Sequence, residues 1–419
     1  MAAQTAVPRT LSARAGRCWR GLVAAAVALA IGCGGVVYAA NNSVQGAKKE
    51  EGGFDGDAPT AILVEASSGS VLFEKNADEL RAPSSMMKLM TAEVVFDAIK
   101  KGDIKLTDEY RISENAWRRG GAPSGTSTMF AAINSKVSVD DLLHGAIIPS
   151  GNDACIALAE GIAGNEHSFA TEFMTKRARE LGMTKSTFGN SNGLPDPANK
   201  MTVRELATLA RHIILTYPDR YKLFGEKEFT WNKIRQQNRN PLLNALPGAD
   251  GLKTGYTKEG GYGMVGSAVQ NDTRLIVVVN GLEDSEDRAT EAKKMLEWGF
   301  RSFETRTLIA ADQPVGYARV FGGESRSVKL VSPDPIKVMV SKNGNDKLLA
   351  RVIYSGPVKA PITAGQKIGV VRVWRGANVA MEAPVFAADA VGTGSTMRRA
   401  LDGAQELVIG MFRAGVEKL

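Results

Sequence analysis

The sequence predicts an α/β (α+β) domain, in which a sheet is packed by helices and carries a helical subdomain, then a small all-β domain and a C-terminal amphipathic helix. Three observations carry this prediction. Strand patterns come first, a block of helical patterns follows, and strand patterns return before a final helix. Short β-type runs recur after Phe303, and the last segment repeats apolar residues at three- and four-residue spacing.

The length and charge of the chain limit its class. With 419 residues, 44% of them hydrophobic, it is long enough for two domains, and its net charge of +7 makes it mildly basic. No block rich in Lys or Arg marks a nucleic-acid site, so we expect no nucleic-acid partner.

The N-terminus is typical of an export signal. A basic stretch ending at Arg20 precedes an uncharged apolar run, and Val37-Tyr-Ala39 offers a small-residue cleavage site. We expect residues 1–39 to be a signal peptide, residues 40–56 a flexible leader, and the mature protein to be exported and peripheral at the extracytoplasmic (periplasmic) face of the cytoplasmic membrane. The alternatives are a retained membrane anchor at 21–40 and lipidation of Cys33, whose preceding residues match that signal poorly.

The positions of the cysteines and histidines argue against a disulfide and against a metal site. After cleavage only Cys155 remains, so no internal disulfide is expected. The three histidines form no His-x-x-x-His pair, and no Cys or His cluster has metal-ligand spacing. We therefore expect neither metal nor cofactor.

The first domain is assigned to residues 57–303. Ala61–Glu65 and Val71–Glu74 flank a Ser/Gly turn and predict a β-hairpin. A helix is expected from Ser84 or Ser85 to Lys101, because Pro83 precedes it and basic residues with Gly102 end it. The remaining predicted elements are helices at 139–164, 167–181, 202–215 and 286–298 and strands at Gly261–Ala268 and Leu275–Asn280.

The second domain is assigned to residues 304–391. Its predicted strands, separated by turn residues, are Val315–Phe321, Ser327–Val331, Ile336–Ser341, Leu348–Tyr354, Lys367–Trp374 and Ala377–Glu382. Residues 395–419 follow as an amphipathic helix, which we expect to lie on a membrane surface; the alternative is that it docks onto the protein's own body.

Three short motifs occur in order along the first domain. Ser85-Met-Met-Lys88 lies at a predicted helix start, Ser150-Gly-Asn152 follows, and Lys253-Thr-Gly255 comes last. Each motif arises easily by chance, but together, in this order and behind an export signal, they are characteristic of penicillin-binding proteins and serine β-lactamases.

The residue types suit a serine nucleophile. A serine hydroxyl needs a base, and Lys88 shares a helix face with Ser85 one turn away. An ordinary lysine pKa of about 10.4 must fall by roughly 2–3 units for this role, which burial among methionines, the second cation Lys253 and the helix N-terminus favour.

The other motif residues have matching roles. Ser150 can relay a proton from Lys88 to the leaving amine, and Asn152 can bind Lys88 and the substrate amide. Lys253 and Thr254, on a strand, can hold a terminal carboxylate, and Gly255 keeps that strand open for close approach. The N–H groups of Ser85 and Tyr256 are proposed as the two oxyanion donors. The purely structural alternative is that Ser84 or Ser85 caps the helix, that Lys88 is solvated and that Ser150-Gly-Asn152 forms a turn.

Over residues 55–419 the chain resembles the low-molecular-mass penicillin-binding D-alanyl-D-alanine carboxypeptidases. The matching stretches are Arg81–Thr91, Asp141–Cys155, Gly251–Tyr262 and Glu297–Phe300. The resemblance implies a penicillin-recognising serine peptidase fold, an acyl-enzyme on Ser85, Lys88 as proton acceptor, Ser150 as auxiliary acid/base and Lys253 as substrate anchor. It also implies that Arg288 helps to bind the substrate carboxylate. The expected activity removes the terminal D-Ala from peptidoglycan pentapeptide stems, with a role in cell-wall remodelling and cell shape, and the expected inhibitors are β-lactams.

Three other functions match parts of this sequence. A class A β-lactamase needs a deacylating glutamate, but Glu228 lies too close to Lys253 for that role. An α/β-hydrolase could use the Gly-x-Ser-x-Gly stretch 189–193, but a turn follows it where a helix is required. An inactive penicillin-binding scaffold would not need the intact motif set.

Overall fold

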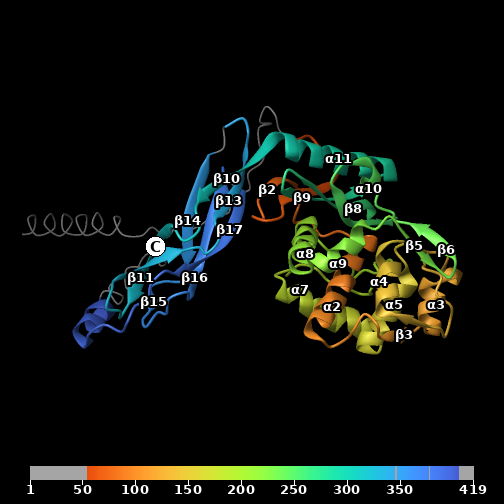
Figure 1. The fold of residues 1–419 in the computed structure, drawn as a ribbon, viewed down its shortest axis with the longest axis horizontal. Coiled ribbons are helices and arrows are strands. Elements are labelled where there is room, and N and C mark those ends of the chain that lie inside the picture. Colours follow the sequence, from red (N-terminus) through yellow and green to blue (C-terminus); the bar gives the residue numbers. More distant parts are fainter. Residues whose placement is uncertain (1–53, 345–346, 377, 405–419) are drawn as a thin grey trace, which may run out of the picture. The chain divides into compact units, whose positions relative to one another are not determined.

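The computed structural model describes residues 54–344, 347–376 and 378–404 (Figure 1). The predicted signal peptide, nearly all of the predicted leader and the C-terminal part of the predicted amphipathic helix lie outside the described residues. Within the described ranges, no helix has the length and apolar character needed to cross a bilayer.

An antiparallel sheet of five strands organises the first domain. Its order is β2 (Val71–Lys75), β1 (Thr60–Glu65), β9 (Thr273–Leu282), β8 (Gly261–Gln270) and β7 (Ala249–Thr257). The first hairpin therefore pairs with the last strands of the domain, because β1 runs antiparallel to β9 in unbroken register from Thr60↔Asn280 to Glu65↔Leu275. The whole helical block is inserted between β2 and β7.

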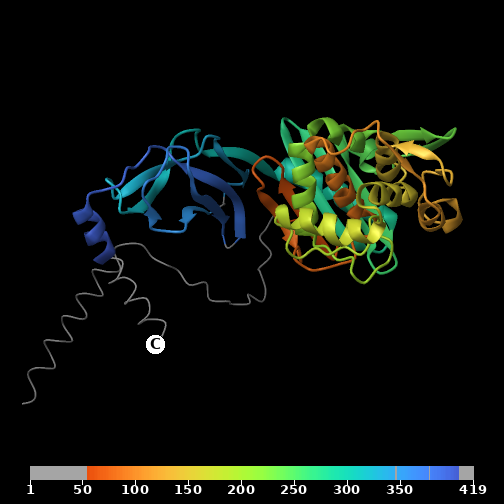
Figure 2. The same cartoon turned by 90° about the horizontal axis from the view of Figure 1, so that it is seen from below.

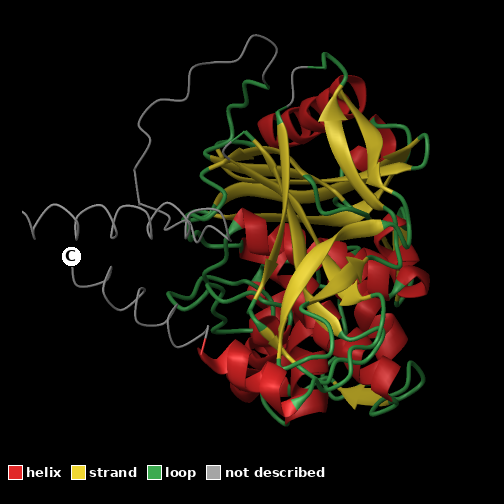
Figure 3. Cartoon of the chain, turned by 90° about the vertical axis from the view of Figure 1, so that its left-hand side faces the viewer, coloured by secondary structure: helices red, strands yellow, loops and turns green. Residues whose placement is uncertain are grey.

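Helices cover both faces of this sheet (Figures 1 and 3). One face carries α11 (Ser285–Ser302), and the other carries the helical block, which Figure 2 shows in front of the sheet. The main helices of the block are α2 (Lys88–Lys101), α3 (Glu114–Gly120), α4 (Val139–Ile147), α5 (Asn152–Ala163) and α8 (Val203–Thr216).

Alternation along the strands divides the core into two layers. Ile62 and Val64 of β1 pack with the helical block, whereas Ala61 and Leu63 pack with the layer that contains Met295 of α11. Successive side chains of a strand point to opposite faces, so strands buried on both sides need apolar residues at nearly every position. β9 meets this need with Leu275-Ile-Val-Val-Val279, all fully buried.

Most of the predicted elements of the first domain are confirmed. The hairpin, the helix ending at Lys101 with Gly102 as its left-handed cap, α8, β8, β9 and α11 all lie where they were expected. The start of the first helix is a 3₁₀ turn, η1 (Ser84–Met87), which leads into α2.

Two segments that were predicted as single helices are interrupted in the structure, so these two predictions were wrong. The expected helix at 139–164 is divided into α4 and α5, because Ser150 takes a left-handed conformation with φ 65° and α5 starts only at Asn152. The expected helix at 167–181 is divided into α6 (Glu166–Ser168), a π-helical stretch η3 (Phe169–Met174) and α7 (Thr175–Glu180).

Several short elements were not predicted. The strands β3 (Glu109–Arg111) and β4 (Lys136–Ser138) form one small ladder, and β5 (Glu228–Trp231) and β6 (Ile234–Gln237) form another. The remaining short helices are η2 (Ala122–Ser124), α9 (Pro218–Tyr221), η4 (Lys222–Gly225) and α10 (Leu242–Ala245).

The second domain is all β, as predicted. A six-stranded sheet has the order β14 (Leu348–Tyr354), β16 (Lys367–Arg375), β17 (Asn378–Ala387), β12 (Ser327–Val331), β11 (Pro314–Phe321) and β15 (Val358–Lys359). A second sheet pairs β10 (Phe303–Ile309) with β13 (Ile336–Ser341). Their apolar side chains enclose a separate core that includes Leu330, Val338 and Val373.

The described end of the chain is helical at 396–404. Its polar side chains bind the second domain: the N–H of Gly322 donates to Asp402 Oδ2 at 2.9 Å, and Arg398 donates to the carbonyl of Glu324 at 2.6 Å. Met397 is 77% exposed and Leu401 is 62% exposed. The apolar stripe of these turns is therefore not docked onto the described part of the protein.

Candidate active site

Ser85 and Lys88 lie together where η1 becomes α2. Pro83 precedes η1, and one helical turn separates the two residues, so Lys88 Nζ lies 2.8 Å from Ser85 Oγ. Ser85 is partly exposed, whereas Lys88 is only 1% exposed. A hydroxyl that substrate can reach thus contacts an amine that water hardly reaches.

The surroundings of Lys88 weaken its hold on a proton. Burial lowers the pKa of Lys88 from its ordinary value near 10.5 to about 8, and the charge of Arg239 acts in the same direction. The carboxylates of Asp153 and Glu166 raise the pKa in part. Burial raises the pKa of the Cys155 thiol to about 12, so this neighbour stays uncharged near neutral pH. Lys88 is therefore able to act as a base at mildly alkaline pH.

Ser150 and Asn152 occupy the break between α4 and α5. The Asn152 N–H donates to the carbonyl of Ser127 at 2.8 Å, and Asn152 Nδ2 donates to Thr126 Oγ1 at 2.9 Å. Ser150 Oγ and Asn152 Oδ1 are buried without a hydrogen-bond partner among the described residues. Unsatisfied buried polar atoms are costly, and they are expected where a ligand completes the bonding.

The carboxylate of Asp153 holds the loop that faces this break. Asp153 is fully buried and accepts bonds from Thr128 Oγ1 and from the N–H groups of Met129, Ala131 and Ala154. The loop is thereby tied to the first turn of α5, directly after Asn152. Sequence reasoning missed this residue, because an acid after Ser-Gly-Asn also reads as an ordinary helix-start residue.

Lys253, Thr254 and Gly255 lie on β7, the last strand of the sheet. The strand passes close to η1: a Cβ added to Gly255 would lie 3.1 Å from the N of Met86 and from the carbonyl oxygen of Pro83. Lys253 Nζ donates to the carbonyl of Thr254 at 3.1 Å. Burial, with the nearby charge of Lys88, lowers the pKa of Lys253 well below its usual value. The charged amine of Lys88 therefore opposes protonation of Lys253.

Arg288 lies at the start of α11, where its side chain is only half-buried. Its guanidinium is 5.6 Å from the ring centre of Tyr262, which in turn stacks on Tyr256 at 4.1 Å. Burial lowers the Arg288 pKa, and its Nε has no hydrogen-bond partner among the described residues. The stack links Arg288 to the end of β7, beside the Lys253–Gly255 motif.

Arg239 is a further cation that the sequence did not reveal. It donates to Ser127 Oγ at 2.6 Å, and its charge lowers the pKa values of both Lys88 and Lys253. The residue lies between two asparagines in a connection without any motif, so only the folded chain identifies it.

Residues of the rival motifs lie in unsuitable places. Glu228 is exposed on β5 and pairs with Arg235 across the small β5–β6 ladder, so it is not placed as a deacylating base. Ser191, of the Gly-x-Ser-x-Gly stretch, is fully buried and donates to Glu166 Oε1 at 2.7 Å. Neither residue has the position that its rival chemistry requires.

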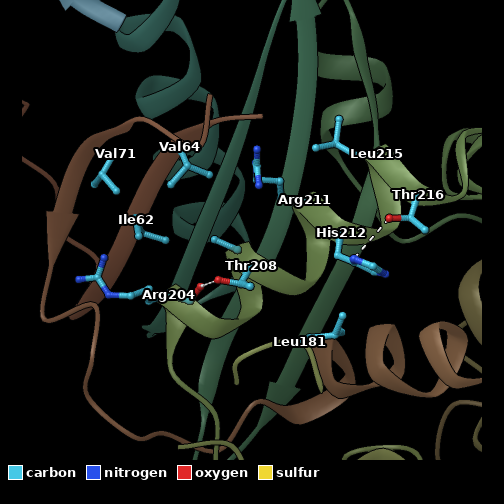
Figure 4. A pocket seen from close by; sticks show the side chains of 12 residues that line it. Ile62, Val64, Val71, Leu181, Arg204, Thr208, Arg211, His212, Leu215 and Thr216 are labelled. Carbon is cyan, nitrogen blue, oxygen red and sulfur yellow. Dashed lines mark hydrogen bonds between the residues drawn. The ribbon is translucent and has the colours of Figure 1, made fainter. Parts of the chain in front are cut away.

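Two pockets of the first domain lie at different distances from the predicted site residues. A pocket of about 550 Å³ lies between α8 and the β1–β2 hairpin; Arg204, Thr208, His212 and Thr216 line it from α8, and Ile62 lines it from the hairpin (Figure 4). It includes none of the predicted site residues, all of which the structure describes. A second pocket of about 250 Å³ adjoins η1 and is lined by Ser84, Gly193, Leu194 and Thr257 among others.

The sequence of the chain matches two family models and several curated relatives. Residues 45–284 match the family model for D-alanyl-D-alanine carboxypeptidase, and residues 303–393 match that for the C-terminal domain of penicillin-binding protein 5. The chain is 43% identical to D-alanyl-D-alanine carboxypeptidase DacC of Escherichia coli (strain K12), over 75% of this chain and 79% of that one. It is 40% identical to DacA of Haemophilus influenzae, over 75% and 80%.

Solved structures agree with this. Penicillin-binding protein 5 of Haemophilus influenzae superposes with a TM-score of 0.70 at 38% identity, covering 81% of this chain and 99% of that one. Penicillin-binding protein D2 of Listeria monocytogenes, in its ampicillin-bound form, superposes with a TM-score of 0.53 at 28% identity, covering 59% and 99%.

Gly193 provides a test of how closely the 190–193 loop packs against η1, the turn that carries Ser85. A Cβ added there would lie 1.9 Å from the carbonyl oxygen of Ser84, at a φ of +82°. Gly182 has a similar φ of +79° but open space around its Cβ position, so Gly182→Ala costs only the left-handed strain of about 1–2 kcal/mol. We expect Gly193→Ala to lower the midpoint of thermal unfolding clearly more than Gly182→Ala, as measured by scanning calorimetry. Equal losses would contradict the close approach.

Proposed function

Because the chain belongs to the D-alanyl-D-alanine carboxypeptidase family and is a serine peptidase of the penicillin-binding protein 5 type, we propose that Ser85 attacks the penultimate D-Ala of peptidoglycan pentapeptide stems. The single observation that carries this proposal is the 2.8 Å contact between Ser85 Oγ and the buried amine of Lys88. The product is a stem shortened by one D-Ala, which fits a role in cell-wall remodelling and cell shape.

In the first step, neutral Lys88 accepts the hydroxyl proton while Ser85 Oγ bonds to the carbonyl carbon. The N–H groups of Ser85 and Tyr256 hold the oxyanion. The carbon–nitrogen bond to the terminal D-Ala then breaks, and Ser150 passes the proton from Lys88 to the departing amine. Asn152 orients the substrate amide. The unpartnered Ser150 Oγ and Asn152 Oδ1 support these two roles.

The substrate carboxylate is assigned to the cationic side of the site. Lys253 and Thr254 lie on β7, and the Tyr256–Tyr262 stack brings Arg288 to the end of this strand. An anion at Lys253 would restore the charged form of that amine, since opposite charge raises a lysine pKa. Gly255 lets β7, the strand that carries Lys253 and Thr254, pass close to η1, where Ser85 lies.

In the second step, water attacks the acyl-enzyme. Lys88, again neutral after the first proton has left with D-Ala, accepts a proton from this water. Ser85 is then released with its hydroxyl restored. Each step uses only groups of this chain, the peptide and water.

β-Lactams are the proposed inhibitors. The Listeria monocytogenes neighbour has been solved in ampicillin-bound and cefotaxime-bound forms. A β-lactam carries an acylating carbonyl and a carboxylate, and the Ser85–Lys253 pair offers the nucleophile and the cation that these two groups need. We propose that β-lactams acylate Ser85.

We also propose that the mature protein is exported and peripheral at the extracytoplasmic face of the cytoplasmic membrane. The exposed Met397 and Leu401 support a membrane contact, and the sequence continues their stripe with Leu407, Met411 and Phe412. The polar bonds of Arg398 and Asp402 to the second domain would leave the apolar side free.

D-Alanine release tests the proposed activity. Residues 40–419 should release D-alanine from a diaminopimelate- or lysine-containing pentapeptide that ends in D-Ala-D-Ala. Ser85→Ala should abolish release, because it removes the hydroxyl that forms the acyl-enzyme. Lys253→Ala should mainly raise KM, because the carboxylate loses its anchor. Release that persists in Ser85→Ala would overturn the nucleophile assignment.

The acylation rate should depend on pH through Lys88. Below its pKa of about 8 the amine carries a proton and cannot accept another, so the rate should fall roughly tenfold per pH unit in this range. Above this value the rate should level off. The measurement is labelling of Ser85 by a fluorescent penicillin between pH 6 and 10. A profile that is flat between pH 6 and 9 would exclude a titrating base.

Membrane association can be tested by cosedimentation. Residues 40–419 should sediment with vesicles of phosphatidylethanolamine and phosphatidylglycerol, and the double variant Met397→Asp/Leu401→Asp should bind less. A chain that ends at Ser395 should stay in the supernatant with its carboxypeptidase activity intact. Equal binding by all three proteins would exclude the helix as the membrane contact.

A further inference from the structure

The amine of Lys88 has a second partner besides Ser85. Its Nζ donates to the carbonyl oxygen of Asn192 at 2.7 Å. A carbonyl oxygen can only accept, so one N–H of the amine must point to Asn192 in either protonation state. A neutral amine has two N–H bonds and one lone pair. Fixing one N–H therefore limits the directions that the lone pair can take, and Ser85 Oγ lies 2.8 Å away.

The position of this carbonyl depends on a turn of loop residues, 190–193. Within the turn, Asn190 Oδ1 accepts from the N–H of Gly193 at 2.8 Å. From outside, Thr91 of α2 donates to the carbonyl of Ser191. No helix or strand includes the turn, so side-chain bonds hold it in place.

Glu166, at the start of α6, accepts three hydrogen bonds from this turn. Its Oε1 accepts from Ser191 Oγ at 2.7 Å, from the Ser191 N–H at 3.2 Å and from Asn192 Nδ2 at 3.2 Å. Its Oε2 accepts from Arg119 of α3 at 3.2 Å. Glu166 is only 6% exposed. Burying a carboxylate is costly unless several donors satisfy it, and four donors do so here.

We propose that Glu166 is a positioning residue for the reaction: it fixes the 190–193 turn so that the Asn192 carbonyl holds the Lys88 amine against Ser85. This inference rests on the proposed function, in which Lys88 is the base. It extends the common arrangement in which a third group orients the base of a nucleophile.

Glu166 also acts on Lys88 through its charge. The charge of Lys88 lowers the pKa of the nearby amine of Lys253 on β7. The charged or titratable groups that act on Lys88 itself are Asp153 and Cys155 from α5, Arg239 and Glu166. Among them Glu166 favours the protonated amine, and its own partner Arg119 reduces this effect. Loss of the charge and loss of the hydrogen bonds therefore have different kinetic signatures.

Two substitutions separate these effects. Glu166→Gln keeps an oxygen that can accept from Ser191 and Asn192 but removes the charge. We expect its acylation profile to shift to lower pH by roughly half a unit, with a plateau close to that of the wild type. Glu166→Ala also removes the acceptor, and we expect its plateau rate to fall on the order of tenfold or more, with little change in penicillin affinity.

Glu205→Ala is the matched control. Glu205 is also a buried carboxylate that holds a turn, since it accepts from the N–H groups of Lys185 and Ser186 and from Ser186 Oγ. It has no bond to the 190–193 turn among those of the described residues. We expect Glu205→Ala to lower thermal stability as Glu166→Ala does but to keep the wild-type plateau and profile.

The experiment uses residues 40–419 and measures acylation by a fluorescent penicillin across pH, resolved into affinity and acylation rate. Wild-type labelling at Ser85 is established first, so its absence would overturn the proposed function itself. With wild-type labelling intact, a wild-type profile in Glu166→Gln overturns the charge effect. A wild-type plateau in folded Glu166→Ala, or an equal loss in Glu205→Ala, reduces Glu166 to a structural role. If Glu166→Ala does not fold, Ser191→Ala takes its place, because it removes the 2.7 Å hydrogen bond to Glu166 Oε1. A wild-type plateau in Ser191→Ala then overturns the positioning role.

Discussion

The burial of the Lys88 amine is the constraint on which the rest of the site depends. An ammonium group is poorly solvated among Met86, Met87, Leu89 and Met90, all of which are fully buried. Its proton is therefore weakly held, which suits Lys88 to the role of base in the proposed mechanism. The Asn192 carbonyl offers the amine a partner that needs no second charge. The buried environment thus activates Ser85 without a histidine or a metal in the proposed mechanism.

The order of strands explains how distant motifs meet. β1 pairs with β9, so the two ends of the domain form a single sheet, and the chain between β2 and β7 is free to fold as a helical block on one face. The block contributes Ser85, Lys88 and the break that carries Ser150. The returning chain contributes Lys253 from β7, the strand that lies against η1. The site therefore lies where the helical block contacts the edge strand β7 of the sheet.

Sequence reasoning identified the parts of the site that have a local signature. Ser85 and Lys88 are one turn apart, and Lys253 lies on a strand as expected. It did not find Arg239, Asp153 or Glu166, because their roles arise only from partners far along the chain. It also joined α4 and α5, since apolar spacing continues through Ile147 and Ile148, although Pro149 and Gly151 mark the break. Periodicity reports which face is buried, but it does not report where the backbone turns.

The buried polar atoms of Ser150, Asn152 and Arg288 that have no partner among the described residues lower the stability of the folded domain. A buried polar atom without a protein partner loses its hydrogen bonds to water on folding, so each of these positions lowers the stability of the domain. Natural proteins keep little stability in reserve. A domain that leaves polar atoms open for its substrate therefore tolerates fewer destabilising changes elsewhere. The fully buried side chains of β9 and of the methionine-rich start of α2 contribute stability that offsets this loss.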